Sequence, residues 1–271
     1  MTIIYLYRSL AAFGGVERIF IDKANYLAEH YGYHVYIITW EQGGHSIVYP
    51  LSPKVTHVDW GILFYRQYQY GLFKRMFMQW KMEKEFFKKL SNFVHTTQAD
   101  IVIGASCEFT TMAGMDLLQR KTHTILETHS MRTSIEKNNP PAGNLLMRRA
   151  FKRRDKQLHQ YIKHMSAFVT LTHNDAKDWS DITPQARIIP NMLHRYPAEI
   201  SPDKKTQKRI ITAGRLVEQK GYDLLLDAWS KVHQKHPEWI LDIYGEGEDK
   251  TMLLEKRKNL ALENSVLFHP R

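Results

Sequence analysis

Short apolar runs alternate with longer amphipathic segments along almost the whole chain, and this alternation is what most restricts its fold. The apolar, β-rich runs cover residues 3–7, 33–40, 54–60, 99–105, 122–128, 166–172 and 186–190. The longest amphipathic segments lie at about 70–95 and 143–164. Strands that alternate with helices form βαβ units, which build a mostly parallel sheet covered by helices on both faces. The sequence therefore predicts a doubly wound, Rossmann-like α/β domain.

The alternation is interrupted once and then starts again. Residues 191–208 are polar, contain two prolines and show no helix or strand period, so we predict a linker there. Further strand and helix patterns follow at 209–214, 221–236, 239–245, 249–261 and 265–269. We therefore predict two Rossmann-like domains, over residues 1–190 and 209–271. Since three strands and two helices make only half of a doubly wound sheet, we expect the second domain to be incomplete and the chain to be truncated at its C-terminal end.

The formal net charge of +10 limits the choice of partners. It favours nucleic acid, an acidic membrane surface or a phosphorylated small molecule, and charge alone does not choose among them. The single cysteine, Cys107, excludes an intrachain disulfide framework and a multi-cysteine metal site, and it favours a reducing compartment. No run approaches the roughly 20 apolar residues that span a bilayer. We therefore expect a cytoplasmic protein whose membrane contact, if any, is peripheral.

Two glycines lie between the first predicted strand and the helix that follows it. The stretch AAFGGVERIF places Gly14 and Gly15 there, where backbone N–H groups can approach a phosphate or sugar oxygen. A tight strand-to-helix turn explains the two glycines equally well. The stretch is not the G-x-G-x-x-G fingerprint, which disfavours a dinucleotide site in this domain.

A histidine lies at the end of a later strand of the same domain. The stretch ILETHSM places Glu127, His129 and Ser130 at the carboxyl end of an apolar run. A histidine at this position can donate to a sugar hydroxyl or titrate near neutral pH. An ordinary residue at the edge of the core is the alternative interpretation, and position alone does not separate the two.

Two cations follow the first strand of the second domain. The stretch TAGRLVEQKGYD holds Arg215 and Lys220 between Gly214 and Gly221, immediately before a predicted helix. Two cations beside a helix N-terminus form a fixed positive site for a diphosphate, with arginine able to bind two oxygens and lysine acting as a point charge. A surface turn with solvated cations is the alternative.

A second glycine loop follows the next strand. The stretch YGEGED contains Gly245 and Gly247, which allow another close approach of the backbone. A single G-x-G is weak support for a binding site. Two such loops at adjacent strand ends are better support than either loop alone.

Two predicted helices combine basic and apolar residues. Residues 147–164 hold seven Lys or Arg and one acid, which indicates either a solvated helix face or an interfacial helix on anionic lipid. In residues 72–90 the aromatic side chains of Phe73, Phe77, Trp80 and Phe87 are mixed with charged residues. We expect these four aromatic side chains to pack in the core.

Several of these stretches, in their order along the chain, resemble one enzyme class. The segments GGVER, IPN, AGRLVEQKGYDLLLDA and LDIYGEGED are similar to those of retaining, nucleotide-sugar-dependent glycosyltransferases of the GT-B fold, the family 4 or "group 1" type. The resemblance covers almost the whole chain, and G-R-L-x-x-x-K-G is its most specific element. It implies an acceptor site in the first domain, a UDP- or GDP-sugar site in the second domain, and two Rossmann-like domains of which the second is incomplete.

The resemblance also implies roles for single residues. Arg215 and Lys220 match the pair that neutralises the donor diphosphate and stabilises the leaving group, which agrees with their charge and position. Gly15 matches a glycine whose backbone faces that diphosphate, and His129 matches a histidine near the transferred sugar.

Other matches and departures bear on the donor site. Glu218 and Gly247 occupy loop positions that face the nucleotide in the family. Asn191 belongs to the IPN segment, but Met192 replaces the glycine that commonly follows it. The family also carries, beyond the point where this sequence stops, a loop with two glutamates that contact the donor sugar and ribose.

The resemblance implies transfer of a sugar to a lipid-linked or polysaccharide acceptor with retention of configuration. It implies that this reaction needs no metal or cofactor. It also implies a protein that is cytoplasmic or peripheral at the inner face of the membrane. An anionic membrane surface is then a candidate partner. The missing glutamate loop motivates an alternative, an inactive fragment that acts only as a binding remnant. A nucleic-acid binder rests on the net charge alone, and without a recognised motif we expect no nucleic acid partner.

Overall fold

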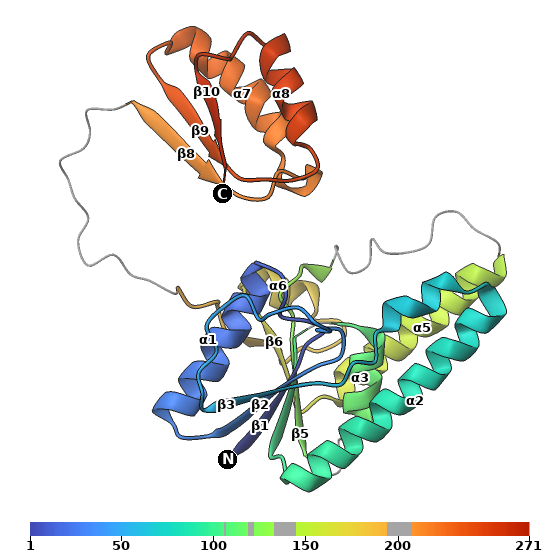
Figure 1. Ribbon diagram of the computed structural model, residues 1–271. Helices are drawn as coiled ribbons and strands as arrows, with labels where there is room; N and C mark the ends of the chain where they lie inside the picture. The colour runs from blue at the N-terminus through green and yellow to red at the C-terminus, as the bar shows by residue number, and fades with distance from the viewer. Residues whose placement is uncertain (106, 119–121, 133–144, 194–207, 271) are drawn as a thin grey trace. The chain divides into compact units, whose positions relative to one another are not determined.

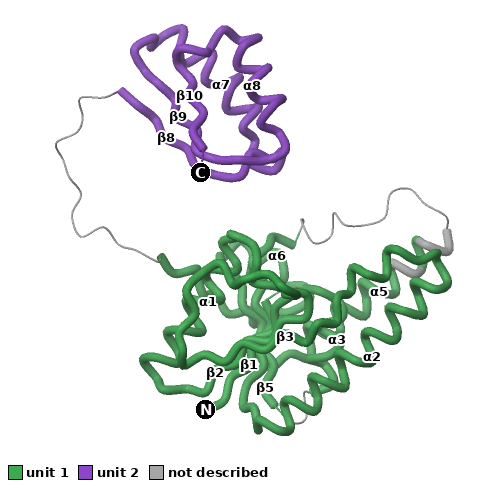
Figure 2. Tube along the Cα trace, viewed as in Figure 1, with its two compact units in different colours: residues 1–195 green, residues 196–271 purple. Residues whose placement is uncertain are grey.

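The computed structural model describes residues 1–105, 107–118, 122–132, 145–193 and 208–270, without the side chains of 145–147, 150 and 151. The chain forms two compact units, residues 1–195 and 196–271 (Figure 2). Most of the predicted linker, residues 194–207, lies outside the described part of the chain. Both units are α/β with parallel sheets, as the alternation of strand and helix patterns predicts.

Unit 1 is built on a seven-stranded sheet with the order β3-β2-β1-β4-β5-β6-β7 (Figure 1). Its strands are β1 Thr2–Leu6, β2 His34–Thr39, β3 Val55–Asp59, β4 Ile101–Gly104, β5 His123–Glu127, β6 Ala167–Thr170 and β7 Arg187–Ile188. All neighbouring pairs are parallel, and β1 lies between β2 and β4. The carboxyl ends of all seven strands therefore meet at one edge.

The helices of unit 1 cover both faces of this sheet (Figure 1). They are α1 Gly15–His30, the 3-10 helix η1 Phe64–Gln69, α2 Leu72–Thr97, α3 Phe109–Asp116, α5 Leu145–His164 and α6 His173–Asp178. Side chains of β1 alternate between two cores, as a strand buried on both faces requires. Ile4 and Leu6 pack in the core that includes Phe86 of α2, whereas Ile3 and Tyr5 pack in the core that includes Phe20 of α1.

Helix α3 was not predicted from the sequence, and its composition explains why. Its eight residues, FTTMAGMD, show no one-sided apolar pattern, because Thr111 and Gly114 share its buried side with Met112 and Met115, whereas Phe109 and Ala113 are only partly buried on the other side. Gly114 brings the helix close to α2, since a Cβ at this position would lie 3.0 Å from Leu90 Cδ2 and 3.1 Å from Phe86 Cε1. Polar and small residues on the buried side remove the apolar helical period on which sequence prediction depends.

The expectation that the aromatic residues of α2 pack in the core is wrong for three of the four. Phe73, Phe77 and Trp80 are 87%, 58% and 54% exposed, and only Phe87 packs against the core. The buried side chains of α2 begin at Met82, so the first turns of the helix extend past the core.

None of the described helices is long and apolar enough to cross a membrane.

Unit 2 has a three-stranded parallel sheet with the order β10-β9-β8. Its elements are β8 Arg209–Ala213, the 3-10 helix η2 Glu218–Lys220, α7 Tyr222–Lys235, β9 Ile240–Tyr244, α8 Lys250–Asn259 and β10 Val266–His269. Leu226 and Trp229 of α7 pack with Leu253 of α8 against Leu241 and Ile243 of β9. The other face of β9 carries the buried Asp242, which binds Arg209 through two hydrogen bonds of 2.6 and 2.7 Å.

Two phenylalanines of α2 provide a matched test of this packing. Phe86 is fully buried between the rings of Trp40 and Trp60, so Phe86→Ala should lower the free energy of unfolding of unit 1 by about 3 to 5 kcal/mol. Phe73→Ala, the same change on the exposed turn, should alter it by less than about 0.5 kcal/mol. Urea unfolding followed by tryptophan fluorescence measures both, and equal effects would contradict the packing described.

Candidate functional site

The carboxyl edge of the unit 1 sheet carries several polar side chains. Tyr7 and Arg8 follow β1, Glu108 precedes α3, and His129 follows β5. Ligands of open α/β sheets bind at this edge, because loops diverge there and helices begin there. Two cavities lie along it.

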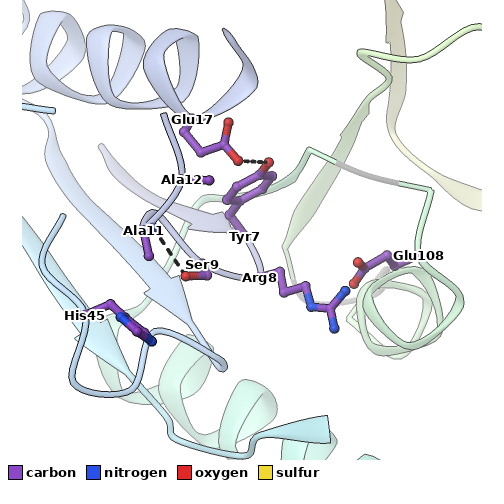
Figure 3. A pocket seen from close by; sticks show the side chains of 8 residues that line it. All are labelled: Tyr7, Arg8, Ser9, Ala11, Ala12, Glu17, His45 and Glu108. Atoms are coloured by element: carbon purple, nitrogen blue, oxygen red, sulfur yellow. Dashed lines mark hydrogen bonds between the residues drawn. The ribbon is translucent and has the colours of Figure 1, made fainter. Parts of the chain in front are cut away.

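The first cavity has a volume of about 440 Å³, within the range of small-molecule sites (Figure 3). It is lined by Tyr7, Arg8, Ser9, Ala11, Ala12, Glu17, His45 and Glu108. In Figure 3 the Arg8 guanidinium extends toward the Glu108 carboxylate, and Tyr7 donates a hydrogen bond of 3.1 Å to Glu17 Oε1. These groups can donate to and accept from several hydroxyls of one ligand.

Burial and neighbouring charges set the protonation of this cavity. Burial raises the pKa of Glu108, and the charge of Glu41 adds to the increase, whereas Arg8 opposes it. Arg8 itself donates through Nε to Glu41 Oε2. Burial and the neighbouring Glu17 raise the pKa of Tyr7, which keeps the phenol neutral. The cavity thus holds two carboxyl groups with different environments beside one fixed cation.

A buried glutamine joins the two loops that form one wall of the cavity. Gln42 Oε1 accepts from the backbone N–H of Leu10 at 2.7 Å and from Ser9 Oγ at 3.1 Å. Gln42 Nε2 donates to the backbone oxygen of His45 at 2.8 Å. One amide therefore fixes the loop after β1 relative to the loop after β2, so the wall is preorganised.

The second cavity, of about 400 Å³, brings together two residues that the sequence analysis selected, Gly15 and His129, with Asn191 of the IPN segment. Gly15 is the first residue of α1, and Gly14 before it provides no side-chain cap. The N–H groups of the first turn are therefore available to a ligand. A Cβ at Gly15 would meet nothing within 4 Å, so its role is not one of local packing.

His129 lies beside a partly buried ion pair. Its side chain is 4% exposed, and Nε2 lies 3.6 Å from Glu127 Oε2. Lys23 of α1 binds both oxygens of Glu127, at 2.6 and 2.7 Å. Burial raises the pKa of Glu127, but His129 and Lys23 outweigh burial and leave it below its ordinary value. The carboxylate is therefore charged at neutral pH and holds the end of β5 against α1.

In unit 2 the loops after β8 and β9 pack on each other through their backbones. Leu216 N donates to Glu246 O at 2.9 Å, and Asp249 N donates to Leu216 O at 3.0 Å. A Cβ at Gly245 would lie 1.9 Å from Gly214 O, and one at Gly247 would lie 2.1 Å from Leu216 O. Contact between the loops thus requires both glycines, a physical reason that the sequence analysis did not give.

The packed loops present the predicted cationic residues to solvent. Arg215 is exposed beside the fully buried Leu216, and Glu218 and Lys220 are exposed on η2. Gly221 has φ +65° and is the N-cap of α7, so Lys220 lies directly before the N-terminus of a helix. Within the described part of the chain, neither Arg215 nor Lys220 forms an ion pair with a carboxylate. The arrangement provides two solvated cations and a helix N-terminus for an anion.

The sequence analysis missed the residues of the first cavity. Arg8 directly follows the first predicted strand, so the rule that ligands bind at strand ends could have found it. Glu108 lies three residues after the predicted strand 99–105, so the same rule could have found it, although the helix that it precedes was not predicted. Among the described residues, no group of three or more His, Cys, Asp or Glu side chains could hold a metal ion.

Comparisons with known proteins identify a matching family and two similar glycosyltransferases. Residues 198–271 match the family described as "Glycosyl transferases group 1". An uncharacterized glycosyltransferase of Haemophilus influenzae is 27% identical over 277 residues, which cover 98% of this chain and 68% of the relative. The amylovoran biosynthesis glycosyltransferase AmsD of Erwinia amylovora is 46% identical over 76 residues, which cover 28% of this chain and 20% of AmsD.

Solved glycosyltransferases share the fold. TarM superposes with a TM-score of 0.68 at 12% identity, over 99% of this chain and 76% of its own. The lipopolysaccharide outer core galactosyltransferase WaaB superposes with a TM-score of 0.66 at 13% identity, over 100% of this chain and 68% of its own. The fold is thus that of GT-B glycosyltransferases, and the matched family and named relatives support a glycosyltransferase function.

Glu127 gives a prediction about pH. Because its folded-state pKa is depressed, Glu127 stabilises the fold fully above its unfolded pKa of about 4.3, and this contribution is lost as the pH falls through the folded-state value. Glu127→Gln should lower the free energy of unfolding by about 2 kcal/mol near neutral pH. The difference from the wild type should shrink in acid.

Urea unfolding at a series of pH values measures this difference. Glu29→Gln, on the exposed side of the same α1 helix that Lys23 belongs to, is the control and should show no such dependence. A difference that stays constant from neutral pH to acid would refute the role of the Glu127 charge.

Gly247 gives a prediction about the packed loops of unit 2. A methyl group at this position overlaps the Leu216 backbone, so Gly247→Ala should destabilise unit 2 by about 1 to 3 kcal/mol. Hydrogen exchange of β8 and β9 measures the effect within the intact chain. Gly44→Ala, where a Cβ would meet nothing within 4 Å, should leave exchange unchanged. Normal protection in the Gly247 variant would show that the two loops do not pack as described.

Proposed function

We propose that this protein transfers a sugar from a UDP- or GDP-sugar to a lipid-linked or polysaccharide acceptor with retention of configuration. The observation that carries the proposal is the placement of Arg215 and Lys220 on the loop after β8, against the glycine loop after β9 and within the segment that matches the family. A diphosphate leaving group accumulates negative charge as its bond to the sugar breaks. Two cations fixed beside a helix N-terminus would stabilise that charge.

The donor site follows from this placement. The Arg215 guanidinium would bind two diphosphate oxygens, and the Lys220 ammonium would act as a point charge on the same group. These cations would take the place of a divalent metal ion, so the reaction would need no metal or cofactor. Glu218 would contact the nucleotide, and the backbone at Gly247 would approach it.

Unit 1 would contribute the acceptor and part of the sugar site. The first turn of α1, beginning at Gly15, would direct its N–H groups at the diphosphate, and His129 would bind the transferred sugar. The cavity at Arg8 and Glu108 would hold acceptor hydroxyls, because it combines donors and acceptors around a volume of about 440 Å³.

Names of relatives and neighbours support the substrate classes. AmsD is named for amylovoran biosynthesis, which supports a polysaccharide product. A TarM structure contains UDP and alpha-GlcNAc-glycerol, which supports a UDP-sugar donor. A lipid-linked acceptor would place the protein at the cytoplasmic face of a membrane as a peripheral protein.

Lys220→Ala tests the donor site. Turnover, measured as release of UDP or GDP from a panel of sugar nucleotides and acceptors, should fall about a hundredfold or more, since a cation on the leaving group acts mainly in the transition state. Lys235→Ala removes the same charge from the exposed end of α7 and should retain near-normal turnover.

Three outcomes would contradict parts of the proposal. Near-normal turnover in the Lys220 variant would refute the diphosphate role. Binding of sugar nucleotides without release of nucleoside diphosphate from any pair would favour the binding-remnant hypothesis. Inversion at the anomeric carbon, seen by NMR of the product, would refute retention.

A further inference from the structure

Exposed apolar side chains occur along η1 and the beginning of α2 in unit 1. We call them the aromatic surface; its members are Tyr65, Tyr68, Leu72, Phe73, Met76, Phe77 and Trp80, all more than half exposed. Soluble proteins rarely expose so many large apolar side chains in one place, and such patches mark interaction sites.

Packing within unit 1 does not explain this surface. All buried side chains of α2 belong to its later turns, from Met82 to Val94, and they follow a spacing of four residues. The earlier turns continue the helix past the core with side chains that are at least as apolar. A helix that only completed the core would have polar residues there.

The charged residues within the segment that carries the aromatic surface have one sign, although Glu41 accepts from the backbone N–H of Tyr65 at 3.1 Å and Glu83 follows the segment. Residues 60–82 contain Arg66, Lys74, Arg75 and Lys81 and no acidic residue. Two of these cations lie over aromatic rings, with Lys74 Nζ 4.3 Å from the ring centre of Tyr70 and Arg75 Cζ 4.1 Å from that of Tyr68. Apolar rings and cations are thus interleaved on one surface.

We propose that the aromatic surface binds an anionic lipid bilayer, with its rings in the boundary between head groups and acyl chains and its cations at the lipid phosphates. Tryptophan and tyrosine favour this boundary, because their rings are apolar and their polar atoms reach water. Long cationic side chains keep their charges at the head groups while their stems lie on apolar surface. Anionic lipids add an attraction for each cation near the surface.

A second copy of the chain fits the surface less well than a bilayer. A two-fold dimer through this surface would place four cations of one copy against the same four of the other, without an acid between residues 60 and 82 to compensate. Like charges facing each other oppose association. The surface is complementary to an anionic partner rather than to itself.

Helix α5 adds charge of the same sign to unit 1. Both α2 and α5 pack against α3, and α5 carries exposed Arg148, Arg149, Lys152 and Lys156. Of the two interpretations of α5 that the sequence left open, the solvated face is compatible with this role, because the helix then contributes long-range attraction without insertion.

Membrane binding by this surface extends the proposed function. Only the reason for the binding, access to a lipid-linked acceptor, rests on that function. A lipid-linked acceptor would be presented at the surface to which unit 1 is bound. Binding itself needs neither donor nor acceptor, so a vesicle experiment fails or succeeds independently of turnover.

Cosedimentation of the whole chain with lipid vesicles tests the proposal. Vesicles of phosphatidylcholine with about 30 mol% phosphatidylglycerol should bind the protein at low salt at least tenfold better than phosphatidylcholine alone, and high salt should weaken the binding. Brominated lipids should quench the fluorescence of Trp80, and the added quenching should be lost in Trp80→Phe.

Matched variants separate the contribution of the apolar side chains to vesicle binding from that of the cations. Phe73→Ser/Phe77→Ser/Trp80→Ser should reduce binding to the anionic vesicles at least tenfold, and circular dichroism should show that the exposed changes leave the fold intact. Leu117→Ser/Leu224→Ser alters two other exposed apolar residues and should bind like the wild type. Lys74→Glu/Lys81→Glu should remove the preference for the anionic lipid.

Several results would overturn the proposal. One is the absence of wild-type binding to the anionic vesicles at low salt, and another is equal binding by the triple serine variant. A third is an oligomer in solution that the triple variant disrupts, which would assign the surface to a second copy of the chain.

Discussion

The parallel pairing of β1 with a strand on each side is the constraint on which the rest of unit 1 depends. Because all seven strands run in one direction, every loop that follows a strand emerges at the same edge. Residues as distant in sequence as Arg8, Glu108 and His129 therefore lie along one line. The same pairing buries both faces of β1, which requires the two cores and the helices that cover them. The site is a direct result of the direction of the strands.

Backbone contact has a comparable role in unit 2. The loops after β8 and β9 approach until no Cβ fits at Gly245 or Gly247, and Leu216 is fully buried next to the exposed Arg215. A solvated cation alone is a weak and mobile anion site. Here Arg215 lies on a loop whose position is fixed by backbone hydrogen bonds to its neighbour, so less freedom would be lost if the proposed diphosphate bound there. Gly245 and Gly247 thus support the candidate site by allowing the two loops to pack on each other, whether or not they also contact a ligand.

The sequence predicted the strands well because buried parallel strands are continuous apolar runs, and their limits are marked by polar residues and glycines. It predicted Gly15, His129 and Arg215 as candidates because each follows a strand end. It failed where tertiary packing decides. Helix α3 lacks a one-sided pattern, and the exposure of Phe73 and Trp80 depends on how far α2 extends past the sheet, which no local period reveals. The Glu127 pair with Lys23 joins residues 104 positions apart and could not be read from either segment.

That ion pair ties α1 to the end of β5, so that the two elements move together. Lys23 lies eight positions after Gly15 on the same helix, and Glu127 lies two positions before His129. Helix α1 cannot slide along the sheet without pulling Lys23 from a buried carboxylate, a separation that a low-dielectric environment opposes strongly. The ion pair therefore keeps the N–H groups at Gly15 and the ring of His129 at a constant separation, although neither of these groups takes part in it.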